Sequence, residues 1–347
     1  MQPLVSIIIP HWNGILLIDE CLKSLQKTTY PNFEIIVVDN NSDDDSVGHI
    51  KTNYPKVIIV ENRVNEGYAG GCNRGAEFAQ GKYLIFLNND TIQTQNWIEP
   101  LVRLAEKNVN IVAVQPKILN YYQKKLFDYA GGAGGMLDFL VYPFARGRIF
   151  TKQETDVKQY DDSIEIFWSS GTAFLVRKTA FEQAGKFDET FFAHMEEIDL
   201  CWRLHLLGYE IWLEPSSVIY HKNAVSLPMY SEKKYYLNHR NSLLMLLANY
   251  SFPVVIYVLP IRWSLDVVAL IYSILHGDWN HIKGIVKAHA WIVFHPLKLY
   301  KKRNFAQNLR QIKDRAILTK MYTKSIVVAH YIFKKKYYSE LSVKPRS

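Results

Sequence analysis

The chain has 347 residues, of which 48% are apolar and 21% are charged, a composition typical of a folded protein with a sizeable core and not of a disordered or fibrous one. Its three cysteines, Cys21, Cys72 and Cys201, form no C-x-x-C motif, so we expect neither a disulfide framework nor a zinc knuckle, and a reducing compartment fits best. The first residues, MQPLVSIIIP, have no charged n-region and no small-residue cleavage site, so we expect no signal peptide.

The net charge of +8 is unevenly distributed along the chain. From His276 to the C-terminus there are 16 Lys and Arg against three acidic residues, whereas residues 1–275 carry 25 Lys and Arg against 30 acidic residues. A mildly acidic body followed by a strongly basic tail indicates a catalytic domain and a segment that attaches to an anionic surface.

Short apolar runs alternate with helical patterns in the first third of the chain. This alternation predicts an α/β fold with a doubly wound, mostly parallel sheet, in which ligands bind beyond the carboxyl ends of the strands. Strands are predicted at Leu4–Ile9, Phe33–Val38, Val57–Val60, Tyr83–Leu87 and Ile111–Val114, and helices at Gly14–Thr28, Tyr68–Gln80 and Trp97–Lys107.

The alternation breaks between Asn120 and Ser163. The run Gly131–Gly135 is expected to be flexible, and a long irregular segment inside a domain is usually a lid, a binding loop or disordered. Further strands are then predicted at Glu165–Trp168, Thr172–Val176, Glu210–Leu213 and Val218–Tyr220, and helices at Lys178–Ala184 and Glu196–Leu207.

Three carboxylates within four positions open the last of these helices. Glu196 and Asp199 share one helix face, while Glu197 points elsewhere near the helix start, where the macrodipole favours a carboxylate. Apolar neighbours such as Phe191 and Trp202 would raise the pKa of a shielded carboxyl group into the range of a general base. The alternative interpretation is a surface helix with acidic residues in its first turn.

Two other stretches carry polar groups where a ligand would bind. Asn88-Asn89-Asp90 follows a buried strand, and its carboxylate can hold a divalent cation that also takes ligand phosphates; an ordinary Asn/Asp turn is the alternative. The glycine-rich segment Asn65–Gly75 lets the backbone approach a phosphate at a helix N-terminus, with Arg74 in reach of a diphosphate. It does not match G-x-G-x-x-G, and a turn that packs the helix on the sheet is the alternative.

Six segments together resemble the family 2 glycosyltransferases with a GT-A fold, especially their bacterial rhamnosyltransferase-like branch. The resemblance implies a doubly wound mixed α/β sheet and an inverting transfer of a sugar from a nucleoside diphosphate donor. The segments are VSIIIPHWNG (Val5–Gly14), VVDNNSDD (Val37–Asp44), NEGYAGGCNRG (Asn65–Gly75), YLIFLNNDT (Tyr83–Thr91), GTAFLVRKTAFEQAGKFDETFF (Gly171–Phe192) and EEIDLCWRLHLLGY (Glu196–Tyr209).

The resemblance also implies roles for single positions. Glu197 falls on the general base, Glu196 is a rival for that role, and Asp199 follows in the family's E-D-x-D-L pattern. We expect the acceptor to enter over Gly131–Gly135. Donor-binding positions are Pro10, Asn13, Asp39, Asn41, Glu66, Gly67, Gly70, Arg74, Asn88 and Asn89, and acceptor-binding positions are Trp168, whose ring can stack on a sugar, and Gly171.

A divalent cation, Mg²⁺ or Mn²⁺, is implied in the same way. Asp90 is the last position of the family's D-x-D metal motif, and His221 falls where some members supply a further ligand. Alone, a histidine at a strand end is more often structural. The first D-x-D position is Asn88 here, which leaves one anionic ligand from that loop and is the best argument for a non-catalytic scaffold that binds sugar nucleotides.

The segment Leu243–Leu275 is mostly apolar, with charges only at Arg262 and Asp266. A single membrane crossing would place the basic tail opposite the catalytic domain, so we expect interfacial helices followed by a basic stretch, His281–Lys336, that lies on anionic lipid. The alternative is a helical subdomain that packs on the catalytic core or forms a homodimer. No nucleic-acid-binding module is recognised, so we expect no nucleic acid partner.

These observations lead to one overall hypothesis. Residues 1–230 form a GT-A catalytic domain and residues 231–347 a basic, helical, membrane-associated region. The enzyme would act at the cytoplasmic face of a bacterial plasma membrane and transfer a sugar, L-rhamnose from dTDP-rhamnose, to a hydroxyl of a lipid-linked cell-surface glycan. The alternatives are a UDP-hexose or UDP-galactofuranose donor, or the non-catalytic scaffold.

Overall fold

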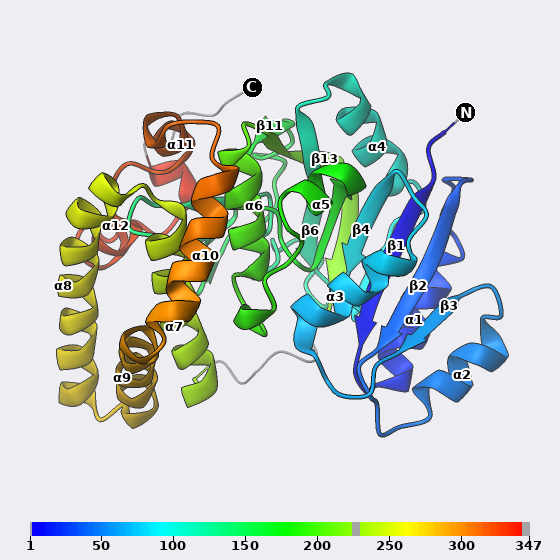
Figure 1. The fold of residues 1–347 in the computed structure, drawn as a ribbon. Helices are drawn as coiled ribbons and strands as arrows, with labels where there is room; N and C mark the ends of the chain where they lie inside the picture. The colour runs from blue at the N-terminus through cyan, green and yellow to red at the C-terminus, as the bar shows by residue number, and fades with distance from the viewer. Residues whose placement is uncertain (1, 224–229, 342–347) are drawn as a thin grey trace.

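A nine-stranded mixed sheet organises the first 221 residues of the computed structural model, which describes residues 2–223 and 230–341 (Figure 1). Its order is β11-β13-β6-β12-β4-β1-β2-β3, with β5 paired to β13. Strands β1 to β4 and β6 run parallel, and β12 lies antiparallel between β4 and β6. The strands are β1 (Val5–His11), β2 (Phe33–Asp39), β3 (Ile58–Glu61), β4 (Tyr83–Leu87), β5 (Thr91–Gln93), β6 (Ile111–Asn120), β11 (Ile164–Glu165), β12 (Ala173–Arg177) and β13 (Glu210–His221).

Helices cover both faces of this sheet, as expected for a doubly wound fold. Ile7 and Ile9 of β1 belong to one apolar cluster together with residues of α1 and α4, whereas Ile8 belongs to the other cluster and lies against α3. Both faces of the central strands are therefore buried, which explains their continuous apolar sequences. The helices of this part are α1 (Ile15–Leu25), α2 (Ser46–Asn53), α3 (Gly67–Phe78), α4 (Ile98–Lys107), α5 (Lys178–Gln183), the 3-10 turn η1 (Glu189–Phe191) and α6 (Glu196–Leu206).

The segment expected to be irregular is largely ordered structure. It contains a second sheet of four short strands, β7 (Gly135–Leu137), β8 (Pro143–Ala145), β9 (Arg148–Ile149) and β10 (Lys152–Gln153). The expected flexibility of Gly131–Gly135 is wrong, because all five residues are buried. A Cβ on Gly135 would lie 2.1 Å from Cδ2 of Trp168, so glycine serves close packing here.

The C-terminal part is helical, and its later segments pack back on the sheet domain. The amide of Tyr322 donates to the carbonyl of Leu137 (2.9 Å), and the amide of Ile326 donates to Asp138 Oδ2 (2.8 Å). The helices are α7 (Glu232–Asn249), α8 (Phe252–His276), α9 (Trp279–Phe294), α10 (Pro296–Leu309), α11 (Asp314–Lys320), α12 (Ile326–Tyr331) and the 3-10 turn η2 (Tyr338–Glu340). The domain boundary at 230/231 remains a prediction, since residues 224–229 beside it lie outside the described ranges.

Helix α8 lies at the outer edge of the C-terminal helices, farthest from the sheet (Figure 1). Among the described residues it is the one helix that is long and apolar enough to cross a membrane. An 18-residue stretch of this helix has a mean hydropathy of 2.0, and 22% of that stretch is buried inside the protein. Length and composition alone support this statement.

Candidate active site

The carboxyl ends of β1, β2 and β4 meet at one edge of the sheet. His11 pairs in register with Asp39, and the amide of Asn40 donates to the carbonyl of His11 (2.7 Å). The side-chain amide of Asn89, after β4, donates to Nδ1 of His11 (2.8 Å). His11 was not among the expected site residues, although it connects the ends of β1 and β4. Burial lowers the pKa of His11, against the opposing charges of Asp39 and Asp44.

The glycine-rich start of α3 lies against the same edge. The side-chain amide of Asn40 donates to the carbonyl of Gly67 (3.1 Å), whose φ of +72° favours glycine. A Cβ on Gly71 would lie 3.1 Å from Cβ of Pro10, and one on Gly70 would lie 2.6 Å from Cβ of Glu66. The structure thus brings together the predicted donor residues of β1 and of the α3 N-terminus.

Two more predicted donor residues belong to the loops at this edge. Asn13 links the loops after β1 and β2, since its amide donates to Ser42 Oγ (2.9 Å) and its side-chain oxygen accepts from the amide of Asp43 (2.8 Å). Asn41 has a φ of 62°, a left-handed conformation that asparagine tolerates better than most residues. Arg74 is different: it is exposed on α3 and paired with Glu77 (2.7 Å), so the structure does not bring it to this edge.

Asp90 and His221 lie together, as the metal assignment requires. Strand β13 pairs with β5, which places Nε2 of His221 3.1 Å from Oδ1 of Asp90, and both side chains are buried. Nδ1 of His221 lies 3.0 Å from Oδ1 of Asp128, and Asn223 donates to the other oxygen of Asp128 (2.6 Å). Burial opposes the imidazolium, but the charges of Asp90 and Asp128 raise the pKa of His221 to about 10.

This donor set fits a divalent cation. A carboxylate is a suitable ligand, and so is the imidazole nitrogen once the cation displaces the proton that His221 holds toward Asp90. A second carboxylate on the far ring nitrogen orients a metal-binding histidine. Residues 2–223 and 230–341 contain no group of three or more His, Cys, Asp or Glu that would form a complete metal site, so two protein ligands would leave the remaining positions to diphosphate oxygens and water. Asp128 was missed by sequence analysis because it lies in the segment expected to be irregular.

The acidic pair opens α6, as predicted from its sequence. Burial, reinforced by the charge of Glu197, raises the pKa of Glu196 well above its usual value. Burial also raises the pKa of Glu197, but backbone amides at the helix start and the amide of Gly171 oppose this rise. Gly171 is further fixed because the Tyr68 hydroxyl donates to its carbonyl (2.6 Å). These hydrogen bonds favour the ionised form of Glu197, which lies beside the predicted acceptor residue Gly171.

Two predicted site residues are not available to a substrate. Asp199 is fully buried and accepts from Arg203 Nε (2.9 Å), Lys302 Nζ (2.9 Å) and Asn249 Nδ2 (3.0 Å), so its carboxylate holds α6 against α7 and α10. Trp168 is 4% exposed, and its Nε1 donates to the carbonyl of Met136 (2.7 Å). Its ring therefore packs inside the protein and offers no face to a sugar.

Two cations that sequence analysis did not single out lie near the Asp90–His221 pair. The Arg148 guanidinium is 4.5 Å and the Lys234 ammonium 5.9 Å from the centre of the Tyr129 ring, next in sequence to Asp128. Neither has an ion-pair partner among the described residues. Burial, and then the charge of Arg148, lowers the pKa of Lys234. A buried Arg148 and a partly buried Lys234, both without an ion-pair partner among the described residues, would be stabilised by an anionic ligand.

Comparison with known proteins places this geometry in context. The chain is 27% identical to glycosyltransferase GlyG of Streptococcus pneumoniae over 65% of its length and 73% of GlyG. It is 29% identical to the O-antigen biosynthesis protein RfbC of Myxococcus xanthus over 65% of its length but 18% of RfbC. An uncharacterized glycosyltransferase of Haemophilus influenzae is 35% identical over 32% of this chain and 36% of its own length. The chain thus matches only part of several relatives.

Solved structures agree on the fold. A structure of GalNAc-T7 with UDP, GalNAc and Mn²⁺ matches 72% of this chain and 49% of its own with a TM-score of 0.57 and 18% identity. The mannosyltransferase PcManGT of Pyrobaculum calidifontis, with GDP-Man and Mn²⁺, matches 92% of this chain and 87% of its own with a TM-score of 0.50 and 15% identity. The expected GT-A fold is therefore confirmed. The model of the family described as Glycosyl transferase family 2 matches residues 6–184, and the chain belongs to that family.

Proposed function

We propose that this protein is an inverting glycosyltransferase that moves a sugar from a nucleoside diphosphate to a hydroxyl of a cell-surface glycan. The observation that carries the proposal is the acidic pair in the first turn of α6, of which Glu196 is buried and Glu197 is partly exposed beside Gly171. Glu197 accepts the proton of the acceptor hydroxyl, whose oxygen attacks the anomeric carbon from the face opposite the diphosphate. The C–O bond to the diphosphate then breaks, and the diphosphate leaves with the electron pair.

The leaving diphosphate needs positive charge, and the structure offers two sources. Asp90 and His221 would hold Mg²⁺ or Mn²⁺, which supplies charge neutralisation at the phosphate oxygens when bound. Arg148 and Lys234 take the role that sequence analysis gave to Arg74, because they lie near Asp128 and have no ion-pair partner in the described ranges. The Mn²⁺ of GalNAc-T7 and PcManGT is consistent with a cation here.

We retain L-rhamnose from dTDP-rhamnose as the proposed donor, with a UDP-hexose or UDP-galactofuranose as the alternative. The rhamnose assignment rests on the motif resemblance described above. Support for a surface glycan as acceptor comes from RfbC and from the poly(ribitol-phosphate) beta-glucosyltransferase of Bacillus spizizenii, which is 39% identical over 25% of this chain. The best argument for a non-catalytic scaffold is Asn88 at the first D-x-D position.

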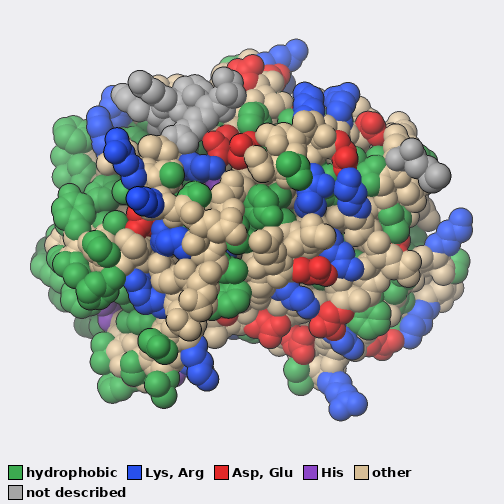
Figure 2. Space-filling view, turned by 45° about the horizontal axis from the view of Figure 1, so that its top comes forward, with side chains coloured by type: hydrophobic (Ala, Val, Ile, Leu, Met, Phe, Trp, Pro, Cys, Tyr) green, Lys and Arg blue, Asp and Glu red, His purple; other side chains and the backbone are tan. Residues whose placement is uncertain are grey.

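We further propose that the acceptor is lipid-linked and that α8 contacts the cytoplasmic face of a plasma membrane. The two charged residues of α8, Arg262 and Asp266, are buried against the protein, where they pair with each other. Its outward face is apolar, the reverse of a helix on a soluble protein. Figure 2 shows hydrophobic side chains gathered on the left side of the molecule. The exposed apolar residues of α8 are Phe252, Ile256, Tyr257, Trp263, Val267, Val268, Ile271, Tyr272, Ile274 and Leu275.

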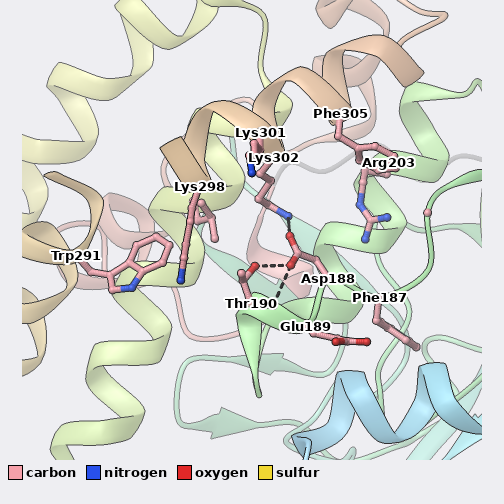
Figure 3. A pocket seen from close by; sticks show the side chains of 12 residues that line it. Phe187, Asp188, Glu189, Thr190, Arg203, Trp291, Lys298, Lys301, Lys302 and Phe305 are labelled. Carbon is pink, nitrogen blue, oxygen red and sulfur yellow. Dashed lines mark hydrogen bonds and ion pairs between the residues drawn. The ribbon is translucent and has the colours of Figure 1, made fainter. Parts of the chain in front are cut away.

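A basic cavity of about 550 Å³ lies near the start of α10 and supports contact with anionic headgroups (Figure 3). Lys298 and Lys301 line it beside Trp291, and neither lysine has an ion-pair partner among the described residues. Lys302, by contrast, is held by Asp188 (2.6 Å). Lys298 and Lys301 lie on the same helix as the exposed apolar residues Leu297 and Tyr300, a combination typical of helices that bind anionic membranes.

The catalytic proposal is tested by incubating the protein with dTDP-rhamnose, UDP-glucose, UDP-galactose and UDP-galactofuranose, with Mg²⁺ or Mn²⁺. Release of nucleoside diphosphate and transfer to a membrane extract are followed by mass spectrometry, and the anomer is assigned by NMR. We expect one donor to be consumed with inversion. No consumption of any donor would favour the scaffold, and retention would exclude the proposed mechanism.

The membrane proposal is tested by sedimentation with vesicles that contain phosphatidylglycerol. The double variant Val268→Glu/Ile271→Glu should lose binding, because each charge would lie in the proposed apolar contact. Val109→Glu is the control, since Val109 is at least as exposed as Val268 and Ile271 but lies on the sheet domain. Unchanged binding of the double variant would exclude α8 as the contact surface.

A further inference from the structure

The loop that presents the acidic pair has an unusually strained backbone. Three non-glycine residues within it, Phe192, His194 and Met195, have φ values of 62°, 67° and 72°. Such left-handed conformations cost about 1 kcal/mol or more each, and they persist only where the surroundings fix them. Met195 is the N-cap of α6 and is followed directly by Glu196 and Glu197, so whatever fixes this loop also fixes the acidic pair.

Asn241, on α7 of the C-terminal part, contacts this loop from inside the protein. Its side-chain amide nitrogen lies 2.7 Å from the carbonyl oxygen of His194, 3.1 Å from that of Ala193 and 3.4 Å from that of Phe191. Asn241 has no exposed surface, so water does not compete for these hydrogen bonds. One amide thus bridges three carbonyls of the strained segment.

Arg240, the preceding residue, holds the other end of the loop. Its Nη2 donates to the carbonyls of Thr190 (2.7 Å) and Phe191 (3.1 Å), and its Nε donates to Oδ1 of Asn241 (2.9 Å). The guanidinium therefore also sets the orientation of the Asn241 amide. Arg240 is 7% exposed and forms no ion pair within the described ranges, so its charge is compensated by carbonyl dipoles.

The same loop also contacts the donor side of the site. The carbonyl of Phe192 accepts from the amide of Tyr68 (3.2 Å), and a Cβ on Gly67 would lie 2.5 Å from that oxygen. The loop therefore lies between the glycine-rich start of α3 and the acidic pair. A shift of the loop would move both the proton acceptor and its neighbour on the donor side.

We propose that Arg240 and Asn241 are positioning residues that clamp loop 190–195 and thereby hold Glu197 in place for proton transfer. The inference deepens the proposed function, because it rests on Glu197 as the base. Both residues lie beyond positions 6–184, which the family model matches, so the C-terminal helical part completes the active site as well as packing on it.

The test compares Asn241→Leu, Arg240→Gln and Arg240→Lys with a matched control, Gln307→Ala. Gln307, on α10, makes a similar set of contacts at the C-terminal end of α7. Its side-chain amide nitrogen lies near the carbonyl oxygens of Ala248, Asn249 and Tyr250. Hydrogen exchange of residues 190–199 is measured in all variants without substrate. Transfer kinetics are measured with whichever sugar nucleotide of the panel above the wild type consumes.

We expect Asn241→Leu and Arg240→Gln to speed exchange in residues 190–199 at least about 10-fold through local opening. We also expect kcat to fall about 100-fold with the donor KM within about 3-fold, since small misplacements of a catalytic group have effects of this size. Arg240→Lys should recover part of kcat. Gln307→Ala should lower thermal stability but leave both readouts unchanged.

The proposal is overturned if exchange in residues 190–199 stays at the wild-type rate in Asn241→Leu, or if the kcat loss equals that of Gln307→Ala. The hydrogen-exchange measurement needs no substrate. A wild-type protein that consumes no donor would refute the proposed function. The hydrogen-exchange rates of residues 190–199 would still decide whether Arg240 and Asn241 clamp the loop.

Discussion

The two members of the acidic pair should respond very differently to the same substitution. Burial, and then the charge of Glu197, raises the pKa of Glu196 well above its usual value, which favours the neutral form of this side chain. Glutamine is nearly isosteric with a protonated glutamic acid, so Glu196→Gln should leave transfer within about 10-fold of the wild type. Glu197→Gln removes the proton acceptor and should lower kcat by about 10² to 10⁴, the usual contribution of a general base.

The same pair gives a stability prediction of defined sign. The pKa of Glu197 is raised above its unfolded value of 4.5, so the folded state binds this proton more tightly than the unfolded state does. Stability is therefore lost as pH rises above 4.5, by about 1.4 kcal/mol for each unit of the rise in pKa, and the loss is complete above the folded pKa. Glu197→Gln should raise the free energy of unfolding at pH 8 but not at pH 4.

The assay combines steady-state transfer with urea unfolding at both pH values. The reasoning is refuted if Glu196→Gln is as damaging as Glu197→Gln, since the base would then be shared or reversed. It is also refuted if Glu197→Gln destabilises the protein at pH 8, because that carboxylate would then be contributing a favourable interaction in its ionised form.

Three further predictions follow from the buried charges. Asp199→Ala should lower the free energy of unfolding by about 3–5 kcal/mol, because it leaves Arg203 buried without its carboxylate; a loss below about 1 kcal/mol in urea unfolding would contradict the structural role. Asp128→Asn should weaken Mn²⁺ binding about 10- to 100-fold in calorimetry with UDP or dTDP present, and an unchanged affinity would show that this carboxylate does not orient the histidine. Arg148→Gln should raise the Kd for UDP or dTDP about 10-fold, whereas Arg74→Gln should not; the reverse pattern would restore the original assignment.

Elements with strong local patterns were predictable from the sequence. The strand Tyr83–Leu87 was predicted with the observed bounds, because a buried parallel strand is a continuous apolar run ended by polar residues. Strand β5 and helix α2 were missed because they are short and only weakly apolar. Glu210–His221 was predicted as two strands, but it forms one, whose register shifts between Glu214 and Val218. Such irregularities depend on the neighbouring strand, which the local sequence does not specify.

The candidate site shows the same division between local and long-range information. Positions in short motifs, such as Asp90 and Glu197, could be placed from the sequence because the motif and the element share one segment. Asp128 and Asn241 could not, because each acts on a residue at least 47 positions away, across contacts that only the fold creates. Trp168 was misjudged because its sequence neighbourhood does not reveal that Gly135 provides the space in which its ring is buried.

The central assignment is a donor site that includes a divalent cation. Calorimetry tests it most directly, by measuring the binding of UDP and dTDP with and without Mn²⁺ to the wild type and to Asp90→Ala. Asp90 and His221 are the two protein ligands proposed, so we expect Mn²⁺ to tighten nucleotide binding in the wild type and to have no effect in the variant. Nucleotide binding that ignores both Mn²⁺ and the loss of Asp90 would contradict the cation site, and no nucleotide binding at all would contradict the transferase assignment itself.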